Sequence, residues 1–171
     1  MTHFPRLTLT YLHGELAARE HAGFRILPFA MNRPSEQETR HPGFEGEQAR
    51  TFYLKSNWLA AAASCLVLAA RHPWSFLRIA AGHLRTFATG THGLARALSH
   101  FGQAALLARR CRAEGVDHIH AHFGLAPATI AWAAARLSPI AGKPLGFSFT
   151  IHGFQDFIEP SARLDHKAPA A

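Results

Sequence analysis

The chain has 171 residues, of which 48% are hydrophobic and 17% are charged, and 18 Lys and Arg against 11 Asp and Glu give a net charge of +7. This composition excludes an intrinsically disordered chain, which is poor in apolar residues and rich in charge. The length predicts one domain over residues 1–171 with a buried core. The two cysteines, Cys65 and Cys111, do not make a disulfide framework.

The first third of the chain predicts a helix, a short strand and a loop. Apolar residues at helical spacing predict a helix over Leu7–Ala22, with Gly23 as its cap. The run Phe24–Phe29 is typical of a short strand that a proline ends. Residues 31–50 are polar and contain two prolines and two glycines, so a loop is predicted there.

The middle of the chain is predicted to be helical throughout. Helices are expected over Trp58–Arg71, over Trp74–Phe87 with Pro73 at its start, and over Gly93–Glu114, which Gly115 ends. The longest apolar run lies in the first of these helices and is shorter than the roughly 20 residues needed to cross a bilayer. Cys65 and Cys111 fall in these helices and are predicted to be packing residues rather than nucleophiles.

Three arginines recur every seven residues in this region. Arg71, Arg78 and Arg85 are assigned to one face of the second helix, beside Trp74 and Leu77. The pattern has two interpretations: a solvated helical face, or a surface that lies on anionic lipid headgroups. The positive charge also permits nucleic-acid binding, but no nucleic-acid motif accompanies it, so no nucleic-acid partner is expected.

The last third predicts a strand, a helix and a second strand. Val116–Phe123 and Gly146–Ile151 read as strands, with a helix over Pro127–Leu137 and a turn at 142–144 between them. A strand, helix and strand within about 35 residues is the βαβ pattern of a parallel sheet. The fold class predicted from this part is therefore α/β.

Three of the 13 histidines gather where these two strands end, while most of the others are scattered on the predicted helices and loops. His120 and His122 close the first strand and His152 follows the second, and ligands of open parallel sheets bind at that edge. Three interpretations stand: a metal site, for which no Cys, Asp or Glu cluster is present; structural hydrogen bonding; or catalysis and substrate binding by neutral imidazoles. The third is favoured for His122 with His152, and His118 is predicted to be structural.

Three segments together match the motifs of one family. They are FPRLTLTY (Phe4–Tyr11), DHIHAHFGLAPATIAWAAARLS (Asp117–Ser138) and FSFTIHGFQDF (Phe147–Phe157). The chain thereby resembles the N-terminal domain of family 4 glycosyltransferases, in the colanic-acid and exopolysaccharide subgroup. The resemblance implies the N-terminal half of a GT-B fold, an incomplete Rossmann-like parallel sheet with flanking helices and a helix-rich middle.

The resemblance also implies roles for particular residues. His152 matches the family histidine at the reaction centre and is the predicted catalytic residue. His120, His122, Gly153 and Asp156 are the predicted acceptor-binding residues, and no metal ligand is predicted. The sequence departs from the family at two places: Leu9 stands for an acidic residue, and Gln155 stands for the aspartate of the HGxD motif, with Asp156 one place later.

The function that the resemblance implies is sugar transfer with retention of configuration, from a nucleotide-sugar to a lipid-linked or polysaccharide acceptor. No cofactor is expected besides the nucleotide-sugar, which a separate C-terminal domain holds in the family, so this chain alone is predicted to be inactive. The expected location is cytoplasmic, peripheral at the inner membrane face. The alternative is a non-catalytic binding domain or pseudo-enzyme partner at a membrane surface.

Overall fold

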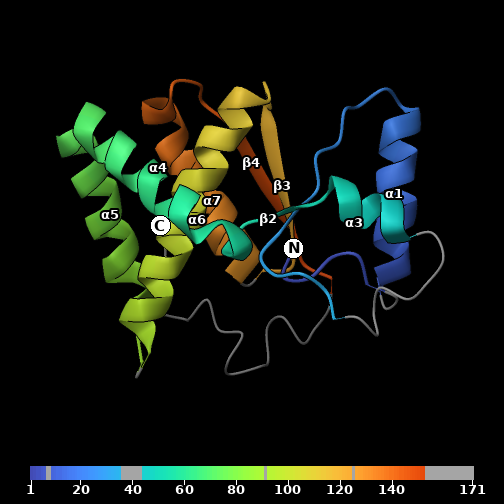
Figure 1. Cartoon of the computed structure of the whole chain (residues 1–171), viewed down its shortest axis with the longest axis horizontal. Helices are drawn as coiled ribbons and strands as arrows, with labels where there is room; N and C mark the ends of the chain where they lie inside the picture. Colours follow the sequence, from blue (N-terminus) through green and yellow to red (C-terminus); the bar gives the residue numbers. More distant parts are fainter. Residues whose placement is uncertain (7–8, 36–43, 91, 125, 153–171) are drawn as a thin grey trace. The chain divides into compact units, whose positions relative to one another are not determined.

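The computed structural model describes residues 1–6, 9–35, 44–90, 92–124 and 126–152. It is mostly helical and contains two small parallel sheets, so the coarse α/β prediction holds (Figure 1). The chain divides into two compact units, Met1–Ser56 and Asn57–Ala171. Each unit is described by itself below.

The described residues of the first unit include two helices and two very short strands. The elements are α1 (Thr10–His21), β1 (Phe29–Ala30), α3 (Phe44–Arg50) and β2 (Phe52–Tyr53). β1 and β2 pair in parallel, and the chain start joins them through a bridge between His3 and Asn32. Phe4, Leu16, Ala30 and Tyr53 form the core of this unit, where the Tyr53 hydroxyl donates a hydrogen bond to the Phe4 carbonyl.

The helix predicted over Leu7–Ala22 is observed as α1 with the shorter bounds Thr10–His21, and the predictions fail for two of the segments that follow it. Gly23 ends α1 with φ +88°, and the N–H groups of Gly23 and Phe24 bond the carbonyls of Glu20 and Arg19. The loop predicted over 31–50 is wrong at its end, because Phe44–Arg50 is helical with two acidic side chains in its first turn, which the helix dipole favours. The strand predicted over 24–29 is observed only at Phe29, where β1 begins.

As far as the structure describes it, the second unit packs four helices beside a two-stranded parallel sheet. The 3₁₀ turn η2 (Lys55–Asn57) leads into it. Its elements are α4 (Trp58–Arg71), α5 (Pro73–Phe87), α6 (Gly93–Ala113), β3 (His118–His122), α7 (Ala126–Ala141) and β4 (Gly146–Thr150). The helix α6 contacts each of the other three helices (Figure 1). Its Ala104, Leu107 and Ala108 are almost fully buried. The three middle helices begin and end within one residue of their predicted bounds.

The helix α7 connects the two strands and covers one face of their sheet. Ala128 and Ala131 of α7 pack on Ala121 of β3, with Ile119 and Phe147 beside them. The parallel pairing of β3 with β4 confirms the βαβ prediction. Side chains at the alternate strand positions therefore lie on the opposite face, away from α7.

The turn from α7 into β4 depends on Gly142. Its φ is +105°, which L side chains rarely adopt, and a Cβ there would lie 2.7 Å from the Arg112 guanidinium carbon. That guanidinium donates a hydrogen bond of 2.9 Å to the Ala141 carbonyl. The Gly142 N–H closes the helix on the carbonyls of Ser138 and Pro139.

We expect Gly142→Ala to destabilise the second unit by about 1–2 kcal/mol, because it combines backbone strain with a clash. Gly82→Ala is the matched control: it lies inside α5, a Cβ there meets nothing within 4 Å, and alanine favours a helix. It should stabilise the protein by up to about 1 kcal/mol. Urea unfolding of both variants checks this, and equal midpoints would contradict it.

His83 of α5 is a buried neutral histidine in the helical core. Its side chain is 1% exposed, its Nε2–H donates to the Ala97 carbonyl at 3.1 Å, and its ring packs against Phe87 and Phe101. Its Nδ1 is buried with no hydrogen-bond partner in the part of the chain that the structure describes. Burial lowers the pKa of His83, and the bond to Ala97 opposes that shift.

A lowered histidine pKa makes the fold acid-sensitive. Below about pH 6.5 the imidazole of His83 is protonated in the unfolded chain but stays neutral in the fold. The free energy of unfolding therefore falls as the pH falls, by at most about 1.4 kcal/mol per pH unit. We expect His83→Phe to remove this component. As the pH falls from 7.5 to 5, the urea midpoint of the wild type should fall further than that of His83→Phe. The exposed His92→Asn control should follow the wild type. Parallel curves for wild type and His83→Phe would refute the assignment.

Candidate functional site

The face of the β3–β4 sheet opposite α7 carries a row of imidazoles and hydroxyls. The strand register places His118 opposite Gly146, His120 opposite Ser148, and His122 opposite Thr150. Because side chains alternate along a strand, all of these share one face, while Ile119 and Phe147 face α7. His118, His120 and His122 therefore lie in a row along this face.

Hydroxyl groups of β4 link the histidines of β3. The Ser148 Oγ lies 2.7 Å from His118 Nε2 and 2.7 Å from His120 Nδ1, and the Thr150 Oγ1 lies 3.0 Å from His120 Nε2. A neutral imidazole carries one N–H and one lone pair, and a hydroxyl can serve either. Both ring nitrogens of His120 are thus satisfied within the sheet, which fixes the orientation of that ring.

Gly146 leaves room for the first imidazole of the row. A Cβ at this position would lie 2.5 Å from His118 Nδ1, closer than any tolerated contact. The His118 ring therefore lies over the glycine on the neighbouring strand. The contact supports the structural role predicted for His118, at the end of the row away from the strand ends.

The two predicted site histidines meet at the carboxyl edge of the sheet. His122 Nδ1 and His152 Nε2 are 2.9 Å apart, so one ring donates its N–H to the other, and the rings stack with centroids 5.1 Å apart. These residues lie 30 positions apart in the chain and come together because β3 and β4 are parallel neighbours. The predicted convergence is confirmed, while the roles assigned to His120, His122 and His152 remain predictions.

Phe123 supports this pair through an unusual backbone conformation. Its φ is +71°, which is rare for a bulky residue and costs free energy. Its N–H donates to the Thr150 carbonyl at 2.8 Å, which extends the sheet by one bond, and its ring lies 5.1 Å from that of His152. Nothing in the sequence pattern singles out Phe123 for this role.

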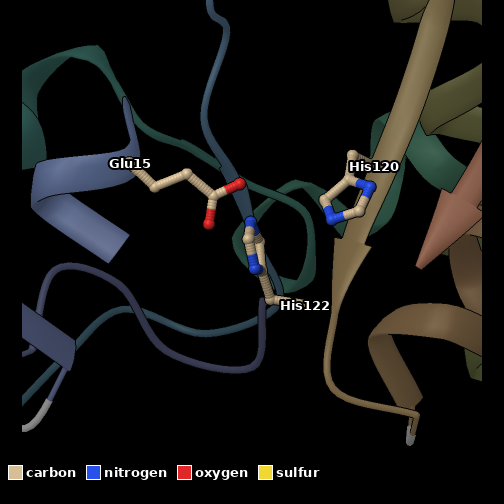
Figure 2. Close-up of side chains that lie close together, drawn as sticks. All are labelled: Glu15, His120 and His122. Atoms are coloured by element: carbon tan, nitrogen blue, oxygen red, sulfur yellow. The ribbon is translucent and has the colours of Figure 1, made fainter. Parts of the chain in front are cut away.

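Figure 2 shows His120 and His122 on β3. His122 is 5% exposed and His120 is half-buried. Glu15, also labelled there, belongs to the first unit, where its carboxylate accepts two hydrogen bonds from Arg19. Within the second unit, a metal ion at the sheet edge would have to replace the His122–His152 hydrogen bond and find a third ligand, since zinc takes at least three protein ligands.

The other predicted site residues fall into two groups, those after His152 and the arginines of the helical region. Gly153 and Asp156 lie outside the described residues. Arg78 and Arg85 are exposed on α5, but Arg71 is the last residue of α4, so its assignment to the second helix is wrong. Because α4 ends before Pro73 and α5 begins there, Arg71 does not share a helix face with Arg78 and Arg85.

The cysteines are packing residues, as predicted. Cys111 is 1% exposed, and burial raises the pKa of its thiol to about 12. Burial also raises the pKa of the Cys65 thiol. Since the thiolate is the nucleophilic form, neither residue is suited to covalent catalysis near pH 7.

Comparisons with known proteins add no assignment. No family model, no curated protein sequence and no solved structure matches the chain. Among the described residues, no helix is both long enough and apolar enough to cross a membrane.

Proposed function

We propose that this chain is the acceptor side of a retaining glycosyltransferase of family 4, with a Rossmann-like sheet of which β3 and β4 are part. The observation that carries the proposal is the His122–His152 pair at the carboxyl edge of two parallel strands. Ligands of open α/β sheets bind at that edge. The segments that bear the pair are also those that resemble the family.

The pair suits recognition of a sugar hydroxyl. A neutral imidazole near pH 7 donates through one nitrogen and accepts through the other, as a hydroxyl does. We propose that His152 contacts the acceptor sugar and that His122 is a positioning residue, which holds the His152 ring through the 2.9 Å bond. His120, whose ring is held by hydrogen bonds to Ser148 and Thr150, packs beside His122 in the row.

The rest of the activity belongs to groups beyond this edge. Transfer from a nucleotide-sugar needs the donor phosphates held and the leaving group stabilised. We propose that a separate donor-binding domain supplies those groups, and that the acceptor is lipid-linked or a polysaccharide at the inner face of a membrane. The chain then works as a peripheral protein and transfers nothing by itself.

Ligand-observed NMR with methyl glycosides of glucose, galactose, mannose and fucose tests the acceptor role. We expect saturation transfer to at least one glycoside, lost in His152→Ala and kept in His118→Ala. Equal binding by both variants, with both folded, would contradict the assignment of His152.

A further inference from the structure

The helix α4 exposes an apolar side. Trp58, Leu59 and Leu66 are 67%, 66% and 72% exposed, and Ala62 and Ala63 between them are exposed as well. The opposite side of α4, with Ala61, Ser64 and Leu68, is buried, and α4 packs on α6. A helix that is apolar all round is ordinarily buried all round. The exposed side of α4 is therefore suited to contact with an apolar surface.

The next helix continues the pattern and adds positive charge. Trp74 and Leu77, in the first two turns of α5, are 84% and 57% exposed, and Arg78 and Arg85 are exposed on the same helix. Positions 74, 77, 78, 81 and 85 follow helical spacing, so they form one stripe. This stripe combines large apolar side chains with cationic ones.

In the segment that contains α4 and α5, every charged side chain is positive. Residues 48–113 contain no Asp or Glu, whereas Arg71, Arg78 and Arg85 lie at the end of α4 and along α5. These three arginines form no ion pair among the described residues. The surface thus attracts anions, and a positively charged protein partner would be repelled.

We propose that the exposed sides of α4 and α5 lie in the headgroup layer of an anionic lipid bilayer. Trp58 is the first residue of α4 and Trp74 the second residue of α5, and indole rings are enriched at the headgroup level of membranes. With 14 residues, α4 is too short to span the hydrocarbon core, so it lies in the plane of the interface. This proposal rests on the membrane location proposed above, and it assigns the membrane contact to α4 and α5.

Vesicle sedimentation tests the electrostatic part. We expect the chain to bind vesicles of 30% phosphatidylglycerol in phosphatidylcholine, and to bind pure phosphatidylcholine far less. Each arginine lost should weaken binding about fivefold, so Arg71→Gln, Arg78→Gln and Arg85→Gln together should weaken it about 100-fold at low salt. Arg110→Gln is the matched control, because Arg110 of α6 is paired with Glu114 at 2.8 Å. No binding to either vesicle would overturn the proposal.

Quenching by brominated lipid tests the contact itself. Trp132 of α7 is half-buried and supplies an internal reference. The variant Trp132→Phe, which keeps Trp58 and Trp74, should be strongly quenched, and the variant Trp58→Phe, Trp74→Phe should be little quenched. Equal quenching overturns the proposal, as does a Leu59- and Leu66-dependent dimer that does not bind vesicles. Neither readout involves sugar, so failure here is distinct from failure of the proposed transferase role.

Discussion

Replacing His152 by alanine should lower sugar transfer by about 100-fold or more in a protein that carries this sequence together with a donor-binding domain. Loss of one well-placed proton-transfer or hydrogen-bonding imidazole typically costs 10²- to 10⁴-fold. His122→Ala should cost less, about tenfold, because His122 acts through the bond that orients His152. Steady-state measurement of kcat and KM for the acceptor checks both variants.

His118→Ala is the control for this prediction. His118 belongs to the same row of imidazoles but lies at the far end of β3, bonded to Ser148. Its loss should change kcat/KM by less than threefold. If His118→Ala and His152→Ala lower kcat/KM equally, the histidine row acts as a structural unit and the assignment of His152 fails.

Leu137→Ala should produce the largest loss of stability, about 2–5 kcal/mol. Leu137 is completely buried in α7, and a large-to-small change there removes apolar contacts and leaves a cavity. Since α7 contacts α6 on one side and β3 and β4 on another, the loss should also weaken the sheet that carries the histidines. Urea unfolding monitored by far-UV circular dichroism measures the effect.

Leu66→Ala is the control for stability. The same chemical change is made in α4, where the side chain is 72% exposed and little apolar surface returns to water. Its free energy of unfolding should stay within about 0.5 kcal/mol of the wild type. A similar loss in both variants would mean that α7 does not carry the core of this unit.

The sequence was most informative where a local signal ends an element. Pro73 separates α4 from α5 and Gly115 ends α6, so these bounds follow from residues that break a helix. The strands β1 and β2 carry no such signal. Each has two residues, and they exist only because segments more than 20 positions apart pair with each other.

The candidate site was predictable only in part for the same reason. His122 and His152 follow strands whose carboxyl ends must meet at one edge, so their approach could be inferred from the βαβ pattern. Ser148 and Thr150 were missed, because their bonds to His118 and His120 depend on the register between strands. Phe123 was missed because its backbone conformation depends on the bond to Thr150 and not on its own preference.

Imidazole ¹⁵N spectra of histidine-labelled protein, recorded with and without a bound acceptor glycoside, test whether His122 and His152 form the acceptor site. His83 is the internal reference, because its ring is buried in the helical core. The nitrogens of His122 and His152 should shift on binding, while those of His83 stay in place. Shifts at other histidines with none at His122 or His152 would contradict it.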